Sequence, residues 1–392
     1  MRKFVACAAA ILAAVVGIGA EIEPVPPYND PLYMPLLAHP APHEAAILDG
    51  AGHKHSAYEV YLTNFGNEPI TIKEVRMTGV LGGKDLFAED ATGPKLKAMY
   101  SAIITADRAA PQDPMLQPGA SGILFMFADF VPERGVPDRF ETSISILGGG
   151  GHVGSGTIDI ASTPVSKDAP FVIQAPVRGE HWMAVNGPSN TSVHRRAVLV
   201  VYGRPYIGQR YAIDWVQVDD RGATYHGDKS DNRSYYCYDQ PIHAVADGKI
   251  VEVQDGVAQN VPNSGKLATQ IRWETLPGNH IVEDLGGGHF AAYAHLIPGS
   301  IKVKQGDEVH VGDVIAHLGN TGNSSEPHLH FQLCDTPSFI KSQGLPFAID
   351  KYTMVDYKRE KSGKEQKLAT GATHQIEKEE PMENELDNFQ PQ

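Results

Sequence analysis

The chain has 392 residues, of which 42% are hydrophobic, and its 33 basic and 47 acidic side chains give a formal net charge of −14. This length is enough for two ordinary hydrophobic cores, and the negative charge argues against nucleic acid as the main partner. The 39 glycines and 28 prolines predict many turns and few long helices.

The first twenty residues are predicted to form a secretory signal peptide. Arg2 and Lys3 precede the apolar stretch Phe4–Ala20, which is shorter than the roughly 20 residues of a typical membrane-spanning helix. We therefore expect cleavage near Ala20 and export to the periplasm or the extracellular space. The mature chain is expected to be soluble and to contain no membrane span.

The three cysteines are too few for a disulfide-stapled scaffold or a cysteine-rich zinc site. Cys7 lies inside the predicted signal peptide, so the mature chain keeps Cys237 and Cys334. These two could pair in an oxidising compartment, but their positions in the sequence do not show whether they are close. Their pairing is left open.

Residues 21–165 are predicted to form a β-sandwich of immunoglobulin-like character. The run Tyr58–Phe65 is rich in β-branched and aromatic residues, and Ile70–Ile72 follows it at hairpin distance. A Pro-Gly turn leads into the apolar end of Leu116–Phe127, and apolar residues alternate with polar ones from Phe140 to Ile146. None of these segments contains a set of catalytic residues.

Two segments are predicted to lie outside the folded domains. Residues 166–192 are rich in proline, glycine and asparagine and are interpreted as an interdomain linker. Residues 358–392 are polar, begin basic and end acidic. Such a composition buries too little apolar area to offset the entropy of ordering, so this tail is predicted to be disordered. The second domain is thereby limited to residues 193–357.

The strongest signal of chemistry is the sequence PHLHF at Pro327–Phe331, which follows a glycine-containing loop. In a strand, His328 and His330 point to the same face, one pleat apart. Two imidazoles so placed can serve one metal centre, one as a ligand and the other acting on bound water or substrate. The alternative is that the two histidines share a strand face only for packing, and the neighbouring sequence argues against it.

Five sequence blocks occur in an order that resembles the lysostaphin-type, LytM-like zinc peptidases. In chain order these are QRYAIDW from Gln209, AVADGKI from Ala244, YAHL from Tyr293, VKQGDEVHVGDVIA from Val303, and HLHF from His328. The resemblance covers about 140 residues, and the order of the blocks is far more specific than a single HxH motif. It implies an all-β protein in which a small antiparallel β-sheet peptidase domain follows the sandwich.

The resemblance implies roles for four residues. In the family, a histidine and an aspartate four residues apart and the second histidine of the HLH motif hold zinc, so Asp214 and His330 are the implied ligands. His295 and His328 are the implied catalytic residues. Zinc lowers the pKa of a bound water to about 7 and polarises the scissile carbonyl. A neutral histidine can then accept the proton while its partner stabilises the oxyanion.

One position departs from the family's pattern. Arg210 stands four residues before Asp214, where the family has its first histidine ligand. A guanidinium is always charged and has no lone pair to donate, so it cannot bind a cation. Either another histidine completes the ligands, with His194 as first choice and His181 as second, or Arg210 pairs with Asp214 and blocks the metal site.

Two functions are therefore considered. The first is an exported zinc-dependent metalloendopeptidase with one Zn²⁺ per chain, acting on the stem or bridge peptides of peptidoglycan. The alternative is a catalytically degenerate LytM-like domain that binds wall peptides or regulates another hydrolase. The presence of His295, His328 and His330 favours the enzyme, because a domain without chemistry has little need of all three.

Overall fold

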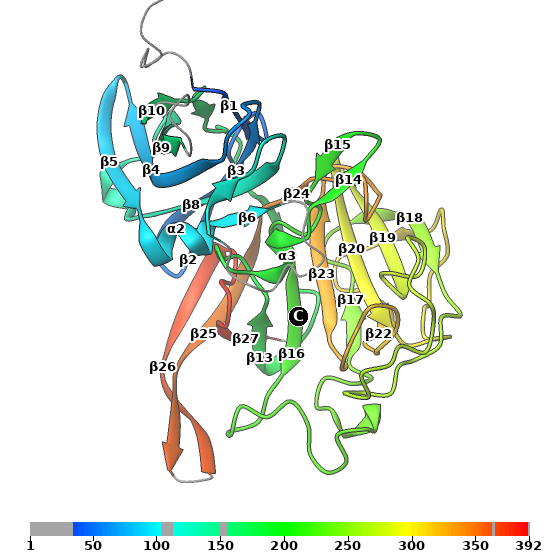
Figure 1. Ribbon diagram of the computed structural model, residues 1–392. Helices are drawn as coiled ribbons and strands as arrows, with labels where there is room; N and C mark the ends of the chain where they lie inside the picture. Colours follow the sequence, from blue (N-terminus) through cyan, green and yellow to red (C-terminus); the bar gives the residue numbers. More distant parts are fainter. Residues whose placement is uncertain (1–33, 103–112, 149–154, 363–364, 391–392) are drawn as a thin grey trace, which may run out of the picture.

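The computed structural model describes residues 34–102, 113–148, 155–362 and 365–390, and strands dominate it. The prediction of an all-β fold is confirmed. Figure 1 shows a sandwich built from the blue to teal part of the chain, beside a larger domain built from the rest. The predicted signal peptide, residues 1–20, lies outside the described residues. Within them, no helix combines the length and the apolar character needed to cross a membrane.

Residues 34–165 form two β-sheets that pack face to face on one hydrophobic core. Tyr58 of the first sheet stacks on Phe140 of the second, with ring centroids 5.4 Å apart. The first sheet contains β1 (Leu36–Ala41), β2 (Ile47–Gly50), β3 (His53–Asn64), β6 (Tyr100–Ala102) and β8 (Ser121–Phe130). The second contains β4 (Ile70–Leu81), β5 (Lys84–Ala91), β7 (Met115–Leu116), β9 (Arg139–Gly148), β10 (Gly156–Asp159) and β11 (Thr163–Pro164). Two short helices, α2 (Gly93–Met99) and η1 (Pro132–Arg134), connect the strands. Two packed sheets thus lie within the predicted range of residues 21–165, while the bounds of that domain and its immunoglobulin-like character stay predictions.

The second domain is built around one long sheet, to which the described residues contribute twelve strands. Its order is β12-β25-β27-β13-β16-β23-β20-β19-β18-β21, with β26 on β25 and β24 on β23. The strands are β12 (Phe171–Ile173), β13 (Gly179–Val185), β16 (Ile213–Gln217), β18 (Gly248–Gln254), β19 (Asn279–Gly286), β20 (His289–Leu296), β21 (Glu308–Val309), β23 (Leu329–Cys334), β24 (Gly344–Leu345), β25 (Phe347–Ser362), β26 (Glu365–Glu379) and β27 (Leu386–Phe389). Two ribbons, β14 (Leu199–Val201) with β15 (Arg204–Tyr206) and β17 (Pro241–His243) with β22 (Val314–His317), and the helices α3 (Val193–Arg196) and η2 (Asn232–Ser234) complete the domain.

Side-chain alternation in the central strands separates the core from the opposite face of the sheet. Trp215 of β16 and Phe331 of β23 are fully buried in the main core of this domain. Their neighbours in sequence, Asp214 and His330, therefore lie on the other face, because successive side chains of a strand point to opposite sides. The apolar residues of these two strands thus hold the polar ones in place.

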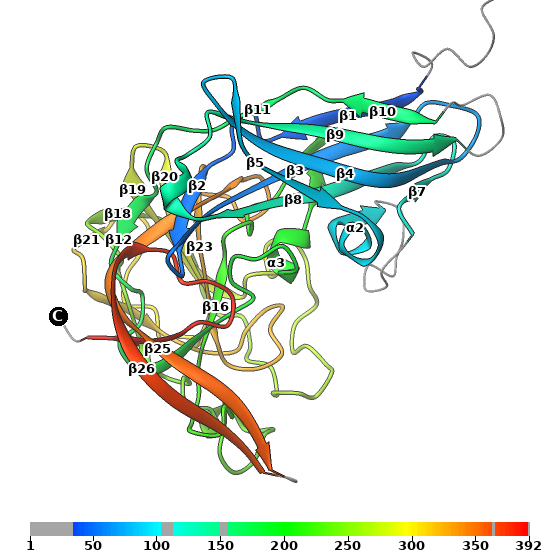
Figure 2. The same cartoon turned by 90° about the vertical axis from the view of Figure 1, so that its left-hand side faces the viewer.

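The predicted boundaries of the second domain are too narrow. Residues 166–192 were predicted to be a linker, but β12 and β13 lie within them, and β13 pairs with β16 in the middle of the sheet. The prediction of a disordered tail over 358–392 is also wrong. That segment forms the end of β25, all of β26, and β27, which lies between β25 and β13. Figure 2 shows β25 and β26 as a long twisted ribbon that runs away from the sandwich.

The tail is ordered because its few apolar residues reach the core. Leu386 and Phe389 are buried, although acidic residues surround them in the sequence. Burial of each large apolar side chain contributes about 1.5–3 kcal/mol. Two such residues stabilise the segment but hardly change its average composition, so a prediction from composition misses them. From Lys367 to Lys378, the polar residues of β26 are exposed on the ribbon.

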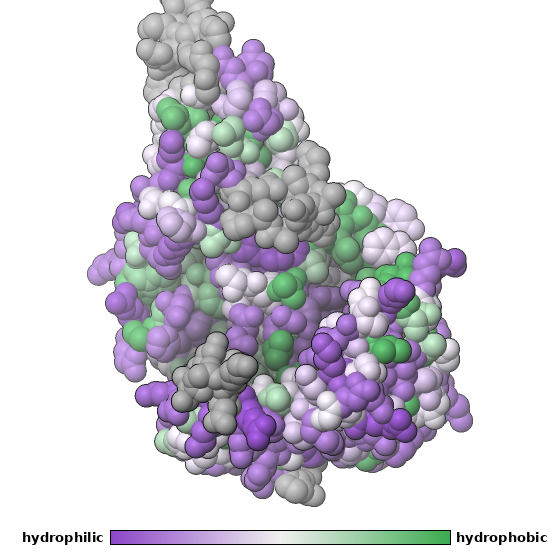
Figure 3. All heavy atoms as spheres, turned by 60° about the horizontal axis from the view of Figure 1, so that its bottom comes forward, coloured by the Kyte–Doolittle hydropathy of each residue, from purple (hydrophilic) through white to green (hydrophobic). Residues whose placement is uncertain are grey.

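The two domains pack directly against each other. One small hydrophobic cluster joins Leu48 of the sandwich to Tyr211, and another joins Phe125 to Ile207. The backbone N–H of Glu380 also donates to the carbonyl oxygen of a sandwich strand, at Asp49, over 2.8 Å. On the face seen in Figure 3, hydrophobic residues occur as small separate groups among polar ones. The apolar surface of this face is therefore divided into small areas.

Candidate active site

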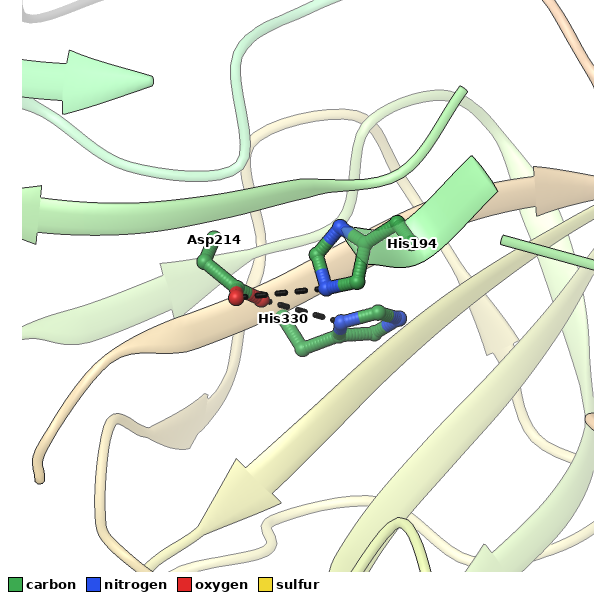
Figure 4. Close-up of side chains that lie close together, drawn as sticks. All are labelled: His194, Asp214 and His330. Atoms are coloured by element: carbon green, nitrogen blue, oxygen red, sulfur yellow. Dashed lines mark hydrogen bonds and ion pairs between the residues drawn. The ribbon is translucent and has the colours of Figure 1, made fainter. Parts of the chain in front are cut away.

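Two paired strands and one short helix bring three possible metal ligands together (Figure 4). Asp214 of β16 and His330 of β23 stand directly opposite each other in the antiparallel register, and His194 comes from α3. His194 Nε2 lies 3.2 Å from Asp214 Oδ2, and His330 Nδ1 lies 3.0 Å from Asp214 Oδ1. All three residues are more than nine-tenths buried. The strand pairing fixes two of them, whereas the third depends on where α3 lies.

This set of donor atoms fits a cation of the zinc type. The two imidazole nitrogens and one carboxylate oxygen lie within 4.8 Å of one another, and no other group of three such residues in the described ranges comes this close. Three protein ligands of these kinds, with a fourth position open, are typical of catalytic zinc sites. A cavity of about 360 Å³ opens over the three residues. The structure thus brings His194, the first choice for a replacement ligand, beside the two residues that the resemblance implied.

Hydrogen bonds determine which nitrogen of each possible ligand faces the centre. The Nδ1–H of His194 donates to the carbonyl oxygens of Asn186 and Ala212, over 3.0 and 3.2 Å, which leaves Nε2 for the centre. The Nε2–H of His330 donates to Gln332 Oε1 over 2.8 Å, which leaves Nδ1. Such partners fix the tautomer and the orientation of metal-binding imidazoles. Gln332 was missed from the sequence, although its spacing of two from His330 on one strand could have identified it.

Asn186 has a second contact with the centre that the sequence did not reveal. Its side-chain Nδ2–H donates to Asp214 Oδ2 over 2.8 Å. Asn186 directly follows β13 and has φ of +53°, a left-handed conformation that asparagine tolerates better than most residues. No motif in the sequence marks this position, because the contact depends on how β13 meets β16 in the folded sheet.

The two predicted catalytic histidines lie beside the three possible ligands. His328 Nε2 is 3.4 Å from Asp214 Oδ1, and the ring centroids of His295 and His328 are 4.7 Å apart. Each ring donates its Nδ1–H to a backbone carbonyl, His295 to Thr321 over 2.7 Å and His328 to Glu326 over 2.8 Å. In the neutral ring, Nε2 then carries a free lone pair. Both histidines line the same cavity as the ligands.

A β-bulge directs His295 into the cavity. Between the pairs Asn279–Leu296 and Ile281–Tyr293, two residues of β20 oppose the single residue His280 of β19. His295 is one of the two, and its φ of +67° is in the left-handed region, which is unusual for a residue with a side chain. Bulges commonly re-aim a side chain at an active site, and backbone strain of this kind gathers at functional positions.

Burial and mutual charge set the protonation of the centre. Burial alone would raise the pKa of Asp214, but the adjacent His194 and His328 hold it well below its usual range. Burial, with the charges of His328 and His330, holds the pKa of His295 well below its ordinary value, and burial also lowers that of His330. For His194 and His328, the Asp214 carboxylate outweighs burial and raises the pKa. The centre therefore contains an ionised carboxylate and at least two imidazoles that favour the neutral form.

Arg210 does not occupy the centre. Its Nη2 lies 2.8 Å from Glu59 Oε2 of the sandwich and 3.0 Å from Gln343 Oε1. The predicted pairing of Arg210 with Asp214 is therefore wrong, because a buried carboxylate from the other domain supplies the counter-charge that a buried guanidinium needs. His181, the second choice for a replacement ligand, lies on β13 outside the group of possible ligands.

Cys237 and Cys334, whose pairing the sequence left open, are both free and buried. The thiol of Cys237 donates to the carbonyl oxygen of Pro327 over 3.1 Å, next to His328. The sulfur of Cys334 accepts from Gln332 Nε2 over 2.8 Å. Burial raises the pKa of both thiols, Cys237 to about 12 and Cys334 to about 11, so neither is a reactive thiolate at neutral pH.

A buried centre of two histidines and one aspartate that opens to a cavity has the donor set of a catalytic zinc site. Residues 235–341 match the model of Peptidase family M23, and the chain contains a lysostaphin-type M23 domain. The matched residues include His295, His328 and His330. Asp214 and His194 lie before them, in the part of the chain where this sequence departs from the family's ligand pattern.

The chain is similar to two curated relatives over 117 residues. It is 36% identical to glycyl-glycine endopeptidase ALE-1 of Staphylococcus capitis, over 26% of each chain. It is 34% identical to lysostaphin of Staphylococcus simulans, over 26% of this chain and 20% of the relative. The chain thus spans about a quarter of the length of the curated relatives that it matches.

Solved structures are also among the proteins similar to this chain. The catalytic domain of lysostaphin from Staphylococcus simulans is 24% identical, over 42% of this chain and 88% of that one, with a TM-score of 0.23. A peptidase M23 from Pseudomonas aeruginosa is 14% identical, over 70% of this chain and 87% of that one, also with a TM-score of 0.23. The family assignment rests on the sequence matches.

Proposed function

We propose that the chain is a zinc-dependent metalloendopeptidase in which His194, Asp214 and His330 hold the metal. The observation that carries the proposal is the convergence of these three donors within 4.8 Å, beside two further histidines in one cavity. A zinc ion bound there supplies Lewis acidity for a peptide carbonyl and lowers the pKa of water. The ion pair between Arg210 and Glu59 supports the proposal. Because Arg210 pairs with Glu59 and not with Asp214, it does not block the metal site, and blocking was the reason to consider a degenerate domain.

His295 and His328 are proposed as the catalytic residues. Each has its Nδ1–H bound to a backbone carbonyl, so Nε2 is the atom free to act. His295 is suited to accept the proton of the attacking water, because its imidazole favours the neutral form. His328 lies 3.4 Å from Asp214, whose carboxylate raises its pKa, so its Nε2 is suited to a hydrogen bond with the developing oxyanion.

The proposed substrate is a peptide of the peptidoglycan cross-link. The cavity over the centre shares Asn323, Ser324 and Ser325 with a second cavity of about 380 Å³, so the two adjoin at this loop, and an extended peptide is proposed to occupy both. One relative is named a glycyl-glycine endopeptidase. By analogy, we expect the substrate of this chain to have residues with small side chains on either side of the cleaved bond. Such a substrate lies outside the cytoplasm, in agreement with the predicted signal peptide and with a periplasmic or extracellular location.

Metal content and turnover, measured on the same preparations, test this proposal. The purified protein is expected to contain about one zinc per chain and to cleave peptidoglycan or an oligoglycine peptide. His330→Ala should lose both, whereas His328→Ala should keep the metal and lose turnover by a factor on the order of 10² or more. A wild-type protein without zinc and without cleavage would instead support the degenerate domain that binds wall peptides or regulates another hydrolase.

A further inference from the structure

Three buried charges link the sandwich to the proposed metal centre. Glu59 of β3 lies between two arginines of the second domain, with Oε1 3.3 Å from Arg195 Nε and Oε2 2.8 Å from Arg210 Nη2. The side chains of all three are at most 3% exposed. A buried charge without a partner is costly, so this group fixes the geometry of whatever it joins. It joins β3 of one domain to α3 and to the turn before β16 of the other.

Helix α3 depends on such contacts for its position. It has four residues, far below the length at which a helix is stable alone, and the side chain of its N-cap, Ser192, donates to the carbonyl of Asn186 instead of capping the first turn. Arg195 Nη2 donates to the carbonyl oxygens of Tyr58 and Met126, both in the sandwich. Arg196 stacks on Phe125, with its guanidinium carbon 4.1 Å from the ring centroid. The sandwich therefore holds this single turn by two adjacent side chains.

The residue immediately before these two arginines is His194. One helical turn thus directs His194 toward Asp214 and the next two side chains into the other domain. The strand register fixes Asp214 and His330 without help from the sandwich. His194 belongs to no strand, and outside α3 its ring is held by the Nδ1–H bonds to the carbonyls of Asn186 and Ala212 and by Asp214. Any shift of α3 moves the imidazole relative to the two other donors. In metal sites, removal of a residue that orients a ligand typically lowers metal affinity 10- to 100-fold.

We propose that the sandwich completes the metal centre: Glu59, through its ion pairs with Arg195 and Arg210, is a positioning residue that aims His194 at the metal. The proposal rests on the proposed function, because it requires that His194 bind the metal. It also assigns a role to Arg210. Arg210 stands where the resemblance places a histidine ligand. In this chain it pairs with Glu59, the carboxylate that also holds Arg195 and thereby positions His194.

A double-mutant cycle in the full-length protein tests the proposal, with Zn²⁺ affinity measured by competition with a chromophoric chelator. Glu59→Gln removes the charge at nearly constant size and should weaken Zn²⁺ binding on the order of 10- to 100-fold. His194→Ala should weaken it at least as much. In the double variant, Glu59→Gln should add less than about 3-fold to the effect of His194→Ala, because a positioning residue has nothing left to position.

Glu380→Gln is the control for substitution of a buried glutamate at the domain boundary, since Glu380 is equally buried but contacts Phe347 rather than α3 and has no arginine partner among the described ion pairs. It should leave Zn²⁺ affinity unchanged. If Glu59→Gln does not fold, as judged by circular dichroism, Glu59→Asp keeps the charge at a shorter reach and should give a smaller loss of affinity. Wild-type affinity in a folded Glu59 variant, or full additivity with His194→Ala, overturns the positioning role. A wild-type protein that binds no zinc overturns the proposed function instead.

Discussion

Each of the four histidines around Asp214 has one nitrogen committed to a hydrogen bond, which leaves the other nitrogen for the centre or the cavity. Three donate to backbone carbonyls and His330 donates to Gln332. The sequence identified His295, His328 and His330 because they lie in recognisable blocks. It could name His194 only as one choice among several, because His194 belongs to no motif.

The Gln332 side chain provides a direct test of this hydrogen-bond pattern. Gln332→Leu keeps the volume but removes the acceptor of the His330 Nε2–H, so the ring loses the contact that fixes its tautomer. We expect Zn²⁺ affinity to fall on the order of 10-fold or more, with the fold unchanged. Chelator competition measures the affinity. An unchanged affinity would show that Asp214 alone is enough to orient His330.

Glu283 provides a test of stability against pH, away from the metal centre. Burial raises its pKa to about 7 from 4.5, while Oε2 accepts a hydrogen bond from the Tyr293 hydroxyl. Between pH 4.5 and 7 the folded state therefore holds a proton that the unfolded state releases. The stability contributed by the protonated group is fully present below pH 4.5 and is lost as the pH rises through 7. The loss is on the order of 3 kcal/mol.

Glu283→Gln cannot ionise, so its free energy of unfolding should fall less between pH 5 and pH 8 than that of the wild type. Urea unfolding at several pH values, with a chelator present, measures the difference. Parallel pH profiles for the two proteins would show that Glu283 is already ionised across this range.

Among the elements, the β25–β27 segment shows where sequence reasoning succeeds and where it fails. The central strands could be predicted because their apolar residues alternate or cluster within a few positions. The strands of the tail could not be predicted in this way. β26 carries mostly polar residues on an exposed ribbon, and β27 pairs with strands that are close to it only in the folded sheet. Pairing of β27 with β13 joins positions about 200 residues apart, which local composition does not reveal.

Leu386 tests whether the tail is part of the fold. Leu386→Ala removes a fully buried side chain of β27 and should lower the free energy of unfolding by about 2–5 kcal/mol. Glu377→Ala, at an exposed position of β26, should change it by less than about 0.5 kcal/mol. Urea denaturation of the two variants separates these outcomes. Equal stability of both variants would indicate that the tail does not contribute to the folded core.

In the whole molecule, the buried charges make the two domains one energetic unit. Glu59 and Arg210 are 151 positions apart, and no pattern in the sequence connects them. For this reason the sequence indicated two domains but not the interface between them, and the only partner it offered for Arg210, as one of two alternatives, was Asp214 rather than Glu59. The correct partner is set by domain packing, which depends on small clusters such as Leu48 with Tyr211.

Arg210→Met tests this coupling. The variant leaves Glu59 buried with one arginine instead of two, and breaking a buried ion pair typically costs about 3–5 kcal/mol. We expect the wild type to unfold in one calorimetric transition and Arg210→Met to unfold at a lower temperature, with separate transitions for the two domains. Separate transitions already in the wild type would show that the domains are not coupled.

The placement of Glu59 also limits how this protein can be engineered. A peptidase domain that carries all of its own metal ligands and their supports can be moved between fusion partners as a module. Here the counter-charge for Arg195 and Arg210 belongs to the sandwich, so a chimaera with a different N-terminal domain would inherit two buried cations and a loosely held helix. A working graft would need a carboxylate at the equivalent of Glu59, or a histidine at position 210 together with a neutral residue at position 195.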